Sequence, residues 1–164
     1  MPAAPKTLED LFHETLKDIY YAEKAILKAL PKMAKKAESE ELRSAFETHR
    51  DETETQVDRL EEIFRTIGKP ARGKTCDAII GLVDEAKEVM EDFKESEALD
   101  AGLLASAQAV EHYEISRYGT LKAWAEKLGM TDAVTLLDTT LKEEKRTDEL
   151  LTRLAEDSLN QKAA

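Results

Sequence analysis

The stretch Ala109-Val-Glu-His-Tyr-Glu-Ile-Ser-Arg-Tyr118 decides the fold, because it places two glutamates in the apolar stripe of a long helical pattern. The pattern runs from about residue 99 to 128 and repeats at the 3-, 4- and 7-residue spacings of a buried helix face. Its apolar members are Leu103, Leu104, Ala107, Val110, Tyr118, Leu121, Trp124 and Leu128. The stripe has no apolar member between Val110 and Tyr118, and at its spacing Glu111 and Glu114 fall on or beside the same helix face. A carboxylate in a core stripe is strongly destabilising unless it is neutralised, paired or bound to a cation, so the pair indicates a metal site.

The composition predicts an all-α protein. Charged residues make up 36% and hydrophobic residues 41% of the 164 residues, with only 6 glycines and 4 prolines. Such a chain is rich in helix formers and poor in turn formers, and it is long enough for one substantial core. We expect a single helical domain over residues 1–164.

The charge excludes several classes of partner. A formal net charge of −11 repels nucleic acid and anionic membrane surfaces, and no apolar run is long enough to span a bilayer. The single cysteine, Cys76, can form no intramolecular disulfide, which fits a reducing compartment. We therefore expect a cytoplasmic protein with neither a nucleic-acid nor a membrane partner.

Periodicity and capping signals predict the helices. Thr7, Ser39 and Thr131 are candidate N-caps, Gly68 is a stop signal, and Pro31 should bend or end the first helix. The four core helices are expected at about residues 7–37, 39–67, 98–128 and 131–159, with a shorter amphipathic helix at about 78–93.

Loop lengths predict the topology. The first two core helices are joined by only a few residues, as are the last two, so each pair should form an antiparallel hairpin. About thirty residues separate the hairpins, enough to travel the length of a bundle. We expect a ferritin-like four-helix bundle in which two hairpins are joined by a long crossover that contains the extra short helix.

Polar interruptions fall near the midpoint of each core helix, and midpoints share one layer whichever way a helix runs. These candidate ligands are Glu23, His49, Glu52, Glu111, Glu114 and Glu144. Carboxylates with one imidazole suit iron or manganese, in a mononuclear or a dinuclear site. Each glutamate alone could instead lie at the surface, Glu111 first among them, and His49 could be a hydrogen-bonded core histidine. The convergence of four helices favours a buried acidic cluster.

Further polar residues near this layer have two interpretations. Tyr20 and Tyr113 could donate hydrogen bonds to ligand carboxylates, or they could be amphipathic residues at the edge of the core. Gln56 and Asp148 could bind a metal ion directly or orient its ligands.

Four segments carry a family resemblance: Asp18-Ile-Tyr-Tyr-Ala-Glu-Lys24, His49-x-x-Glu-Thr53, Gln108-x-Val-Glu-His-Tyr-Glu-Ile-x-x-Tyr-Gly-Thr-Leu121 and Glu143-Glu-Lys-x-Thr-Asp148. Together they resemble the bacterial YciE/YciF family over about residues 6 to 160. The resemblance implies a ferritin-like bundle with an added crossover helix, a homodimer, a metal site between the helices and a link to stress responses.

The chain departs from the wider ferritin-like pattern. Typical di-iron members carry Glu-x-x-His on the second helix, and many repeat it on the fourth. Here Thr55 follows Glu52 at that spacing, Thr147 follows Glu144, and His49 precedes its glutamate. Standard ferroxidase or oxygenase chemistry is therefore in question, and enzymatic activity stays open.

Two functions compete, with a third ranked behind them. The first is a ferritin-like metal-binding protein that holds one or two iron or manganese ions and reacts Fe(II) with oxygen or peroxide. The second is a non-enzymatic, stress-associated structural or interaction module with a vestigial metal site. The third, an iron store, would require a large cage.

Overall fold

The computed structural model describes residue 1 and residues 3–164, and over these it contains helices and no strand. The helices are α1 (Leu8–Lys36), α2 (Glu40–Thr66), α3 (Asp77–Asp92), α4 (Leu99–Lys127), α5 (Thr131–Leu154), a π-helical turn (Ala155–Leu159) and α6 (Asn160–Ala163). The all-α prediction is confirmed. No helix among the described residues combines the length and apolarity needed to cross a bilayer.

Two of the three predicted N-caps, Thr7 and Ser39, are confirmed. Thr7 and Asp10 form a reciprocal capping box at the start of α1, and the Ser39 side chain accepts a hydrogen bond from the first turn of α2. The prediction for Thr131 is wrong: Met130 occupies the N-cap position of α5, and no side chain caps that end. Thr131 is instead the first residue inside the helix.

The chain leaves α2 and α4 through glycines. Gly68 has φ = 69° and Gly129 has φ = 70°, a region of backbone conformation that only glycine adopts without strain. Pro31 does not end α1, which continues to Lys36. Proline removes one backbone donor, and the packing of α1 against its neighbours holds the helix across this position.

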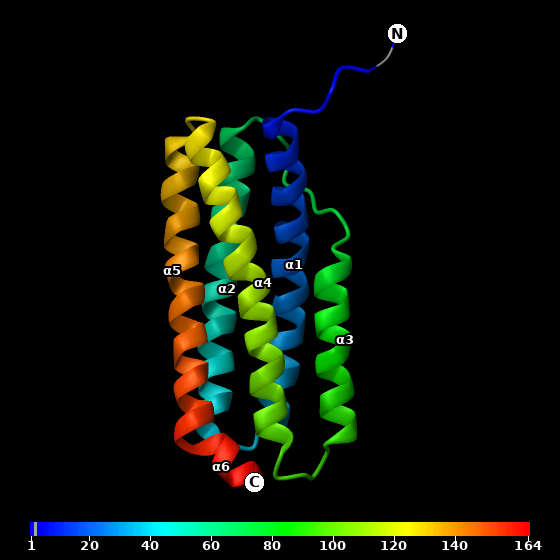
Figure 1. Cartoon of the computed structure of the whole chain (residues 1–164), viewed down its shortest axis with the longest axis vertical. Helices are drawn as coiled ribbons and strands as arrows, with labels where there is room; N and C mark the ends of the chain where they lie inside the picture. The colour runs from blue at the N-terminus through cyan, green and yellow to red at the C-terminus, as the bar shows by residue number, and fades with distance from the viewer. Residues whose placement is uncertain (2) are drawn as a thin grey trace.

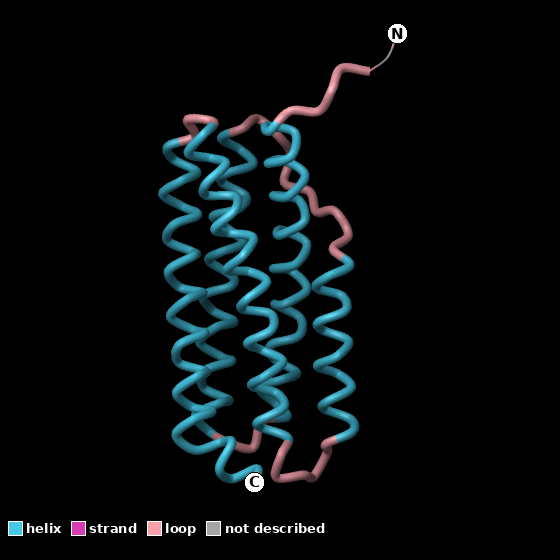
Figure 2. Tube along the Cα trace, in the orientation of Figure 1, coloured by secondary structure: helices cyan, strands magenta, loops and turns pink. Residues whose placement is uncertain are grey.

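The four long helices form a bundle of two hairpins (Figure 1). α1 packs antiparallel to α2, and α4 packs antiparallel to α5; further contacts join α2 to α5 and α1 to α4. The long connection returns the chain to the lower end of the bundle, so α2 and α4 run in the same direction (Figure 2). This connectivity brings the midpoints of all four helices to one level.

The crossover helix α3 lies outside the bundle against α1 and α4. Cys76, the N-cap residue of α3, joins it to α4 by a 3.1 Å contact between the Cys76 sulfur and the Tyr113 hydroxyl. Near its other end α3 approaches α4 so closely that a Cβ on Gly102 would lie 2.7 Å from a methyl carbon of Val89. A glycine at this position therefore permits the close packing of the two helices.

Asp100, in the first turn of α4, ties the two hairpins together. Its carboxylate accepts hydrogen bonds of 2.9 Å from the amide of Glu38 and 2.7 Å from the amide of Ser39, both in the turn between α1 and α2. Asp100 is buried and the two amides are partly buried, so these charge-assisted bonds are partly shielded from water.

Buried polar residues gather near the middle of the helices, whereas the apolar core extends towards their ends. The buried polar residues of this middle layer are Glu23, His49, Thr53, Gln56, Glu111, Glu114 and Glu144. The bundle therefore has a polar layer inside an apolar core, as the interrupted helix stripes predicted.

Candidate metal centre

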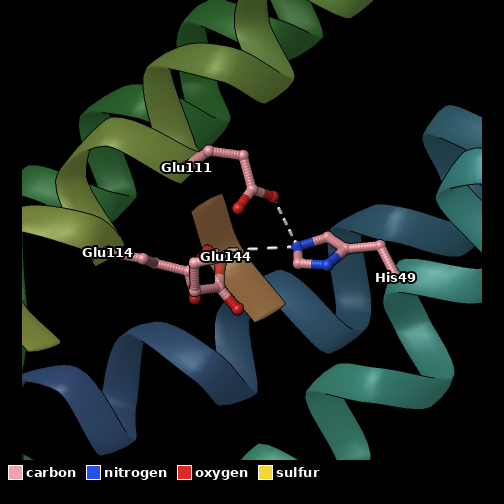
Figure 3. A group of neighbouring side chains, drawn as sticks. All are labelled: His49, Glu111, Glu114 and Glu144. Carbon is pink, nitrogen blue, oxygen red and sulfur yellow. Dashed lines mark ion pairs between the residues drawn. The ribbon is translucent and has the colours of Figure 1, made fainter. Parts of the chain in front are cut away.

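Three helices bring four acidic or imidazole side chains together in the bundle core (Figure 3). His49 comes from α2, Glu111 and Glu114 from α4, and Glu144 from α5. One potential ligand atom from each lies within 4.8 Å of all the others, and all four residues are buried. Glu111 and Glu114 can both contribute because a three-residue spacing places them on adjoining turns of one helix face.

The imidazole of His49 points into the group of carboxylates (Figure 3). Its Nε2 atom lies 2.7 Å from an oxygen of Glu111 and 4.0 Å from an oxygen of Glu114. The contact with Glu111 has the distance of an ion pair but lacks the alignment of a hydrogen bond, so both ring nitrogens have no hydrogen-bond partner. The ring is therefore poised to donate either a proton or a lone pair to this cluster.

Six buried carboxylate oxygens in this layer accept no hydrogen bond. They are both oxygens of Glu114, both oxygens of Glu144 and one oxygen each of Glu23 and Glu111. Buried polar atoms are nearly always partnered, because an unpartnered one loses its hydration without compensation. A cation among these oxygens would supply the missing partner, so the donor set fits a metal ion.

The shared burial of these groups strongly perturbs their protonation. Burial, followed by repulsion from Glu144, raises the pKa of Glu23 to about 7. Burial and the neighbouring carboxylates also raise the pKa values of Glu114 and Glu144 well above their ordinary range. Burial opposes a charge on His49, but the neighbouring carboxylates Glu111, Glu52 and Glu144 together outweigh it and raise the imidazole pKa well above its ordinary value. Without a cation, the layer thus retains protons at neutral pH.

Glu23 lies on α1, beside the four-residue cluster. It is fully buried, and one of its oxygens accepts a hydrogen bond from the hydroxyl of Tyr118 on α4. Tyr118 was expected only as a core residue. Its position, one turn beyond Glu114 on the same helix face, was the available signal that its hydroxyl would meet an acid.

Tyr20 and Tyr113 do not donate hydrogen bonds to the ligand carboxylates, so that interpretation is wrong. Tyr20 donates to Glu61 at 2.8 Å, and Tyr113 donates to Asp18. Both acceptors lie outside the cluster of ligand atoms.

Glu52 occupies the rim of the site. One of its oxygens lies 4.0 Å from Nδ1 of His49, but the carboxylate also accepts hydrogen bonds from Arg146 at 3.3 Å and from Thr147 at 3.4 Å. Its side chain is 25% exposed. The neighbouring His49 lowers the pKa of Glu52, opposite to the shift in the core. The structure thus brings Glu52 to the edge of the acidic layer rather than into its centre.

Of the two further polar candidates, only Gln56 faces the buried layer. It is fully buried, and neither its amide nitrogen nor its amide oxygen has a hydrogen-bond partner. Asp148 lies instead with exposed His112, at 3.1 Å, and accepts a bond from Gln108 at 3.2 Å.

The chain resembles known proteins over nearly its full length. The family model described as a domain of unknown function (DUF892) matches residues 7–164. Protein YciF of Escherichia coli strain K12 is 45% identical over 159 residues, 96% of each chain. The crystal structure of the E. coli stress protein YciF has a TM-score of 0.91 at 44% identity, over 96% of this chain and 99% of that one.

Two further solved structures share the fold. YcfI of Rhodopseudomonas palustris, for which a structural role has been proposed, has a TM-score of 0.88 at 46% identity, over 93% of this chain and 97% of that one. A protein of Xanthomonas campestris has a TM-score of 0.70 at 20% identity, over 92% of each chain. At that identity the likeness concerns the fold alone.

Proposed function

The chain belongs to the family described as a domain of unknown function (DUF892), and from that premise we propose that it is a ferritin-like metal-binding protein of the stress response. The resemblance to the YciE/YciF family is confirmed by the 45% identity with YciF. We propose that the bundle core holds one or two iron or manganese ions.

The six unpartnered carboxylate oxygens carry this proposal. Glutamate oxygens with a single imidazole nitrogen form a hard donor set, which suits iron and manganese better than a closed zinc site. The inner ligands would be His49, Glu111, Glu114 and Glu144, which converge within 4.8 Å. Glu23 would serve a second ion, and Glu52 would reach the site only by leaving Arg146 and Thr147.

The protein's own groups would control protons and water around the ion. Tyr118 holds one oxygen of Glu23, which leaves the other oxygen free, and burial keeps bulk water from the inner carboxylates. Iron, when bound, would supply electrons to oxygen or peroxide. Because the site lacks the usual Glu-x-x-His pair, redox turnover is a separate question from binding.

Metal content tests the proposal. Protein purified without an affinity tag is loaded anaerobically with Fe(II) or Mn(II), desalted and measured by elemental mass spectrometry. We expect one to two ions per chain, and loss of most bound metal in Glu114→Gln and Glu144→Gln. The matched controls are Glu126→Gln on α4 and Glu149→Gln on α5, both at exposed positions, which should keep wild-type metal content.

The same experiment tests how much Glu52, at the rim of the site, contributes to metal affinity. Glu52→Gln should lower the affinity for metal less than Glu114→Gln does, because Glu52 starts outside the inner cluster. Circular dichroism verifies that each variant keeps its helices. Equal metal content in wild type and in both inner-ligand variants would rule out this site.

A structural or interaction module is the second candidate. The contact of His49 with Glu111 and the bond from Tyr118 to Glu23 favour it, because they compensate part of the buried acidity without metal. The proposed structural role of YcfI points the same way. This function predicts no metal uptake and a melting temperature that is unchanged by a chelator.

We also propose that the protein is a cytoplasmic homodimer. Size exclusion with light scattering tests the oligomeric state. A mass near twice that of the 18.4 kDa chain is expected, whereas an assembly of many chains would support a storage cage.

A further inference from the structure

A cavity of about 670 Å³ lies between α1, α3 and α4, beside the proposed metal layer. Its volume falls within the range of about 300–1,000 Å³ that is typical of small-molecule sites. His49 and Glu111 form part of its lining, so the cavity borders the buried acidic cluster. Side chains of the crossover helix α3 line one side of it.

The cavity wall is mainly apolar. It includes Ile26, Leu30 and Met33 of α1, Val83 and Met90 of α3, and Val110 of α4. Two of these are flexible methionines, which adapt to ligands of varied shape. An aliphatic chain would lose its contact with water on entering this space, which favours its binding.

The cavity lining carries cations although the protein as a whole is acidic. Lys24, Lys28 and Lys32 follow one another at four-residue spacing on α1, and all three are exposed. Arg72 and Lys87 are the other two cations of the lining. Apart from buried Glu111, the acid of this lining is Asp84, which pairs with Lys87 at 3.1 Å. Cations therefore outnumber acids at the cavity mouth, in a chain of net charge −11.

We propose that this cavity binds an amphipathic anion, a single aliphatic chain that ends in a carboxylate. The lysines of α1 hold the carboxylate at the mouth, and the chain lies along the apolar wall towards His49 and Glu111. This site adjoins the proposed metal site through His49 and Glu111, but its lysines and its apolar wall lie outside the four-residue metal cluster.

The charge pattern argues against two other occupants. A second copy of the chain, docked by two-fold symmetry, would bring the lysines of one mouth towards those of the other. The phosphates of a nucleic acid would contact the cations at the mouth, but a nucleic acid would leave the apolar cavity behind them empty. An amphipathic anion matches both features.

Calorimetric titration of the metal-free protein tests the proposal with hexanoate, octanoate and decanoate, each below its micelle concentration. Burial of each added methylene should strengthen binding by about three- to fourfold, so decanoate should bind far more tightly than hexanoate. Decyltrimethylammonium, which has the same chain and the opposite charge, should bind at least tenfold more weakly than decanoate. Absence of decanoate binding, or equal affinity across the three chain lengths, would overturn the proposal.

Two variants locate the site. Lys28→Glu should weaken decanoate binding by about three- to tenfold, whereas Lys36→Glu should not, because Lys36 is an exposed lysine two turns further along α1 and outside the cavity. Ala29→Trp, which fills the cavity from its wall, should abolish binding while circular dichroism stays unchanged. Equal effects of the two lysine variants would refute this location. Metal content, measured separately, distinguishes a failure here from a failure of the metal site.

Discussion

The stability of the metal-free protein should fall as pH rises from 5 to 7, and Glu23 gives the magnitude. Its pKa is about 7 in the folded protein, against an ordinary value of 4.5. The folded state therefore binds the proton more tightly than the unfolded chain does, and the associated stability is lost as pH rises through this window. At about 1.4 kcal/mol per pH unit, Glu23 alone lowers the free energy of unfolding by about 3 kcal/mol between pH 4.5 and 7.

Neighbouring groups also change the stability within or just above this pH window. The raised pKa values of Glu114 and Glu144 add to the decline with rising pH. The raised pKa of His49 provides stability that is present below pH 6.5 and lost as pH rises through its folded value, so its sign is the same. Burial lowers the pKa of His13, which acts in the opposite direction. A comparison with a Glu23 variant separates Glu23 from these contributions.

Urea unfolding with chelator present, at pH 5, 6 and 7, provides the measurement. Glu23→Gln keeps an acceptor for the Tyr118 hydroxyl but removes the titration. The stability of this variant relative to wild type should rise by about 2–3 kcal/mol from pH 5 to pH 7. The exposed-site variant Glu126→Gln should instead parallel wild type at all three values. A difference between Glu23→Gln and wild type that does not change with pH would refute the reasoning.

Three further predictions follow from the packing and the protonation of the core. Tyr118→Phe should lower the free energy of unfolding by about 1–3 kcal/mol, measured in urea, because it removes the donor to buried Glu23. Gly102→Ala should lower the melting temperature, because its Cβ would meet Val89 at 2.7 Å; Gly81→Ala, with open space around its Cβ, should raise it. Binding of metal at pH 7 should release protons, because the raised acids must ionise to serve as ligands; a weakly buffered indicator assay would detect the release, and uptake without it would contradict the assigned protonation.

Helical periodicity was enough to predict the helices and the level of the polar layer. The midpoint of a helix keeps its height whichever way the helix runs, so Glu23, Glu114 and Glu144 could be assigned to one layer before their contacts were known. The N-terminus of α5 was less predictable. Met130 occupies the N-cap position, so Thr131 is already inside the helix.

Rotation about each helix axis is what the sequence left open. His49 and Glu52 are three residues apart, so their side chains diverge by about 60° and only one of them can point straight at the bundle axis. His49 takes that direction, and Glu52 meets Arg146 instead. The role of Tyr118 was hidden for a related reason, because a tyrosine in an apolar stripe does not reveal which acid its hydroxyl meets. The cavity behind α3 depends on helix docking, which periodicity does not specify.

Asp100 has a consequence for the order in which the molecule opens. The Asp100 carboxylate accepts hydrogen bonds from the amides of Glu38 and Ser39. The turn between α1 and α2 therefore cannot move away from α4 without breaking two charge-assisted bonds. Local unfolding should therefore start at the opposite end of the bundle and reach this turn last. In hydrogen exchange, these two loop amides should show the protection of core helix amides, and Asp100→Ala should release them together.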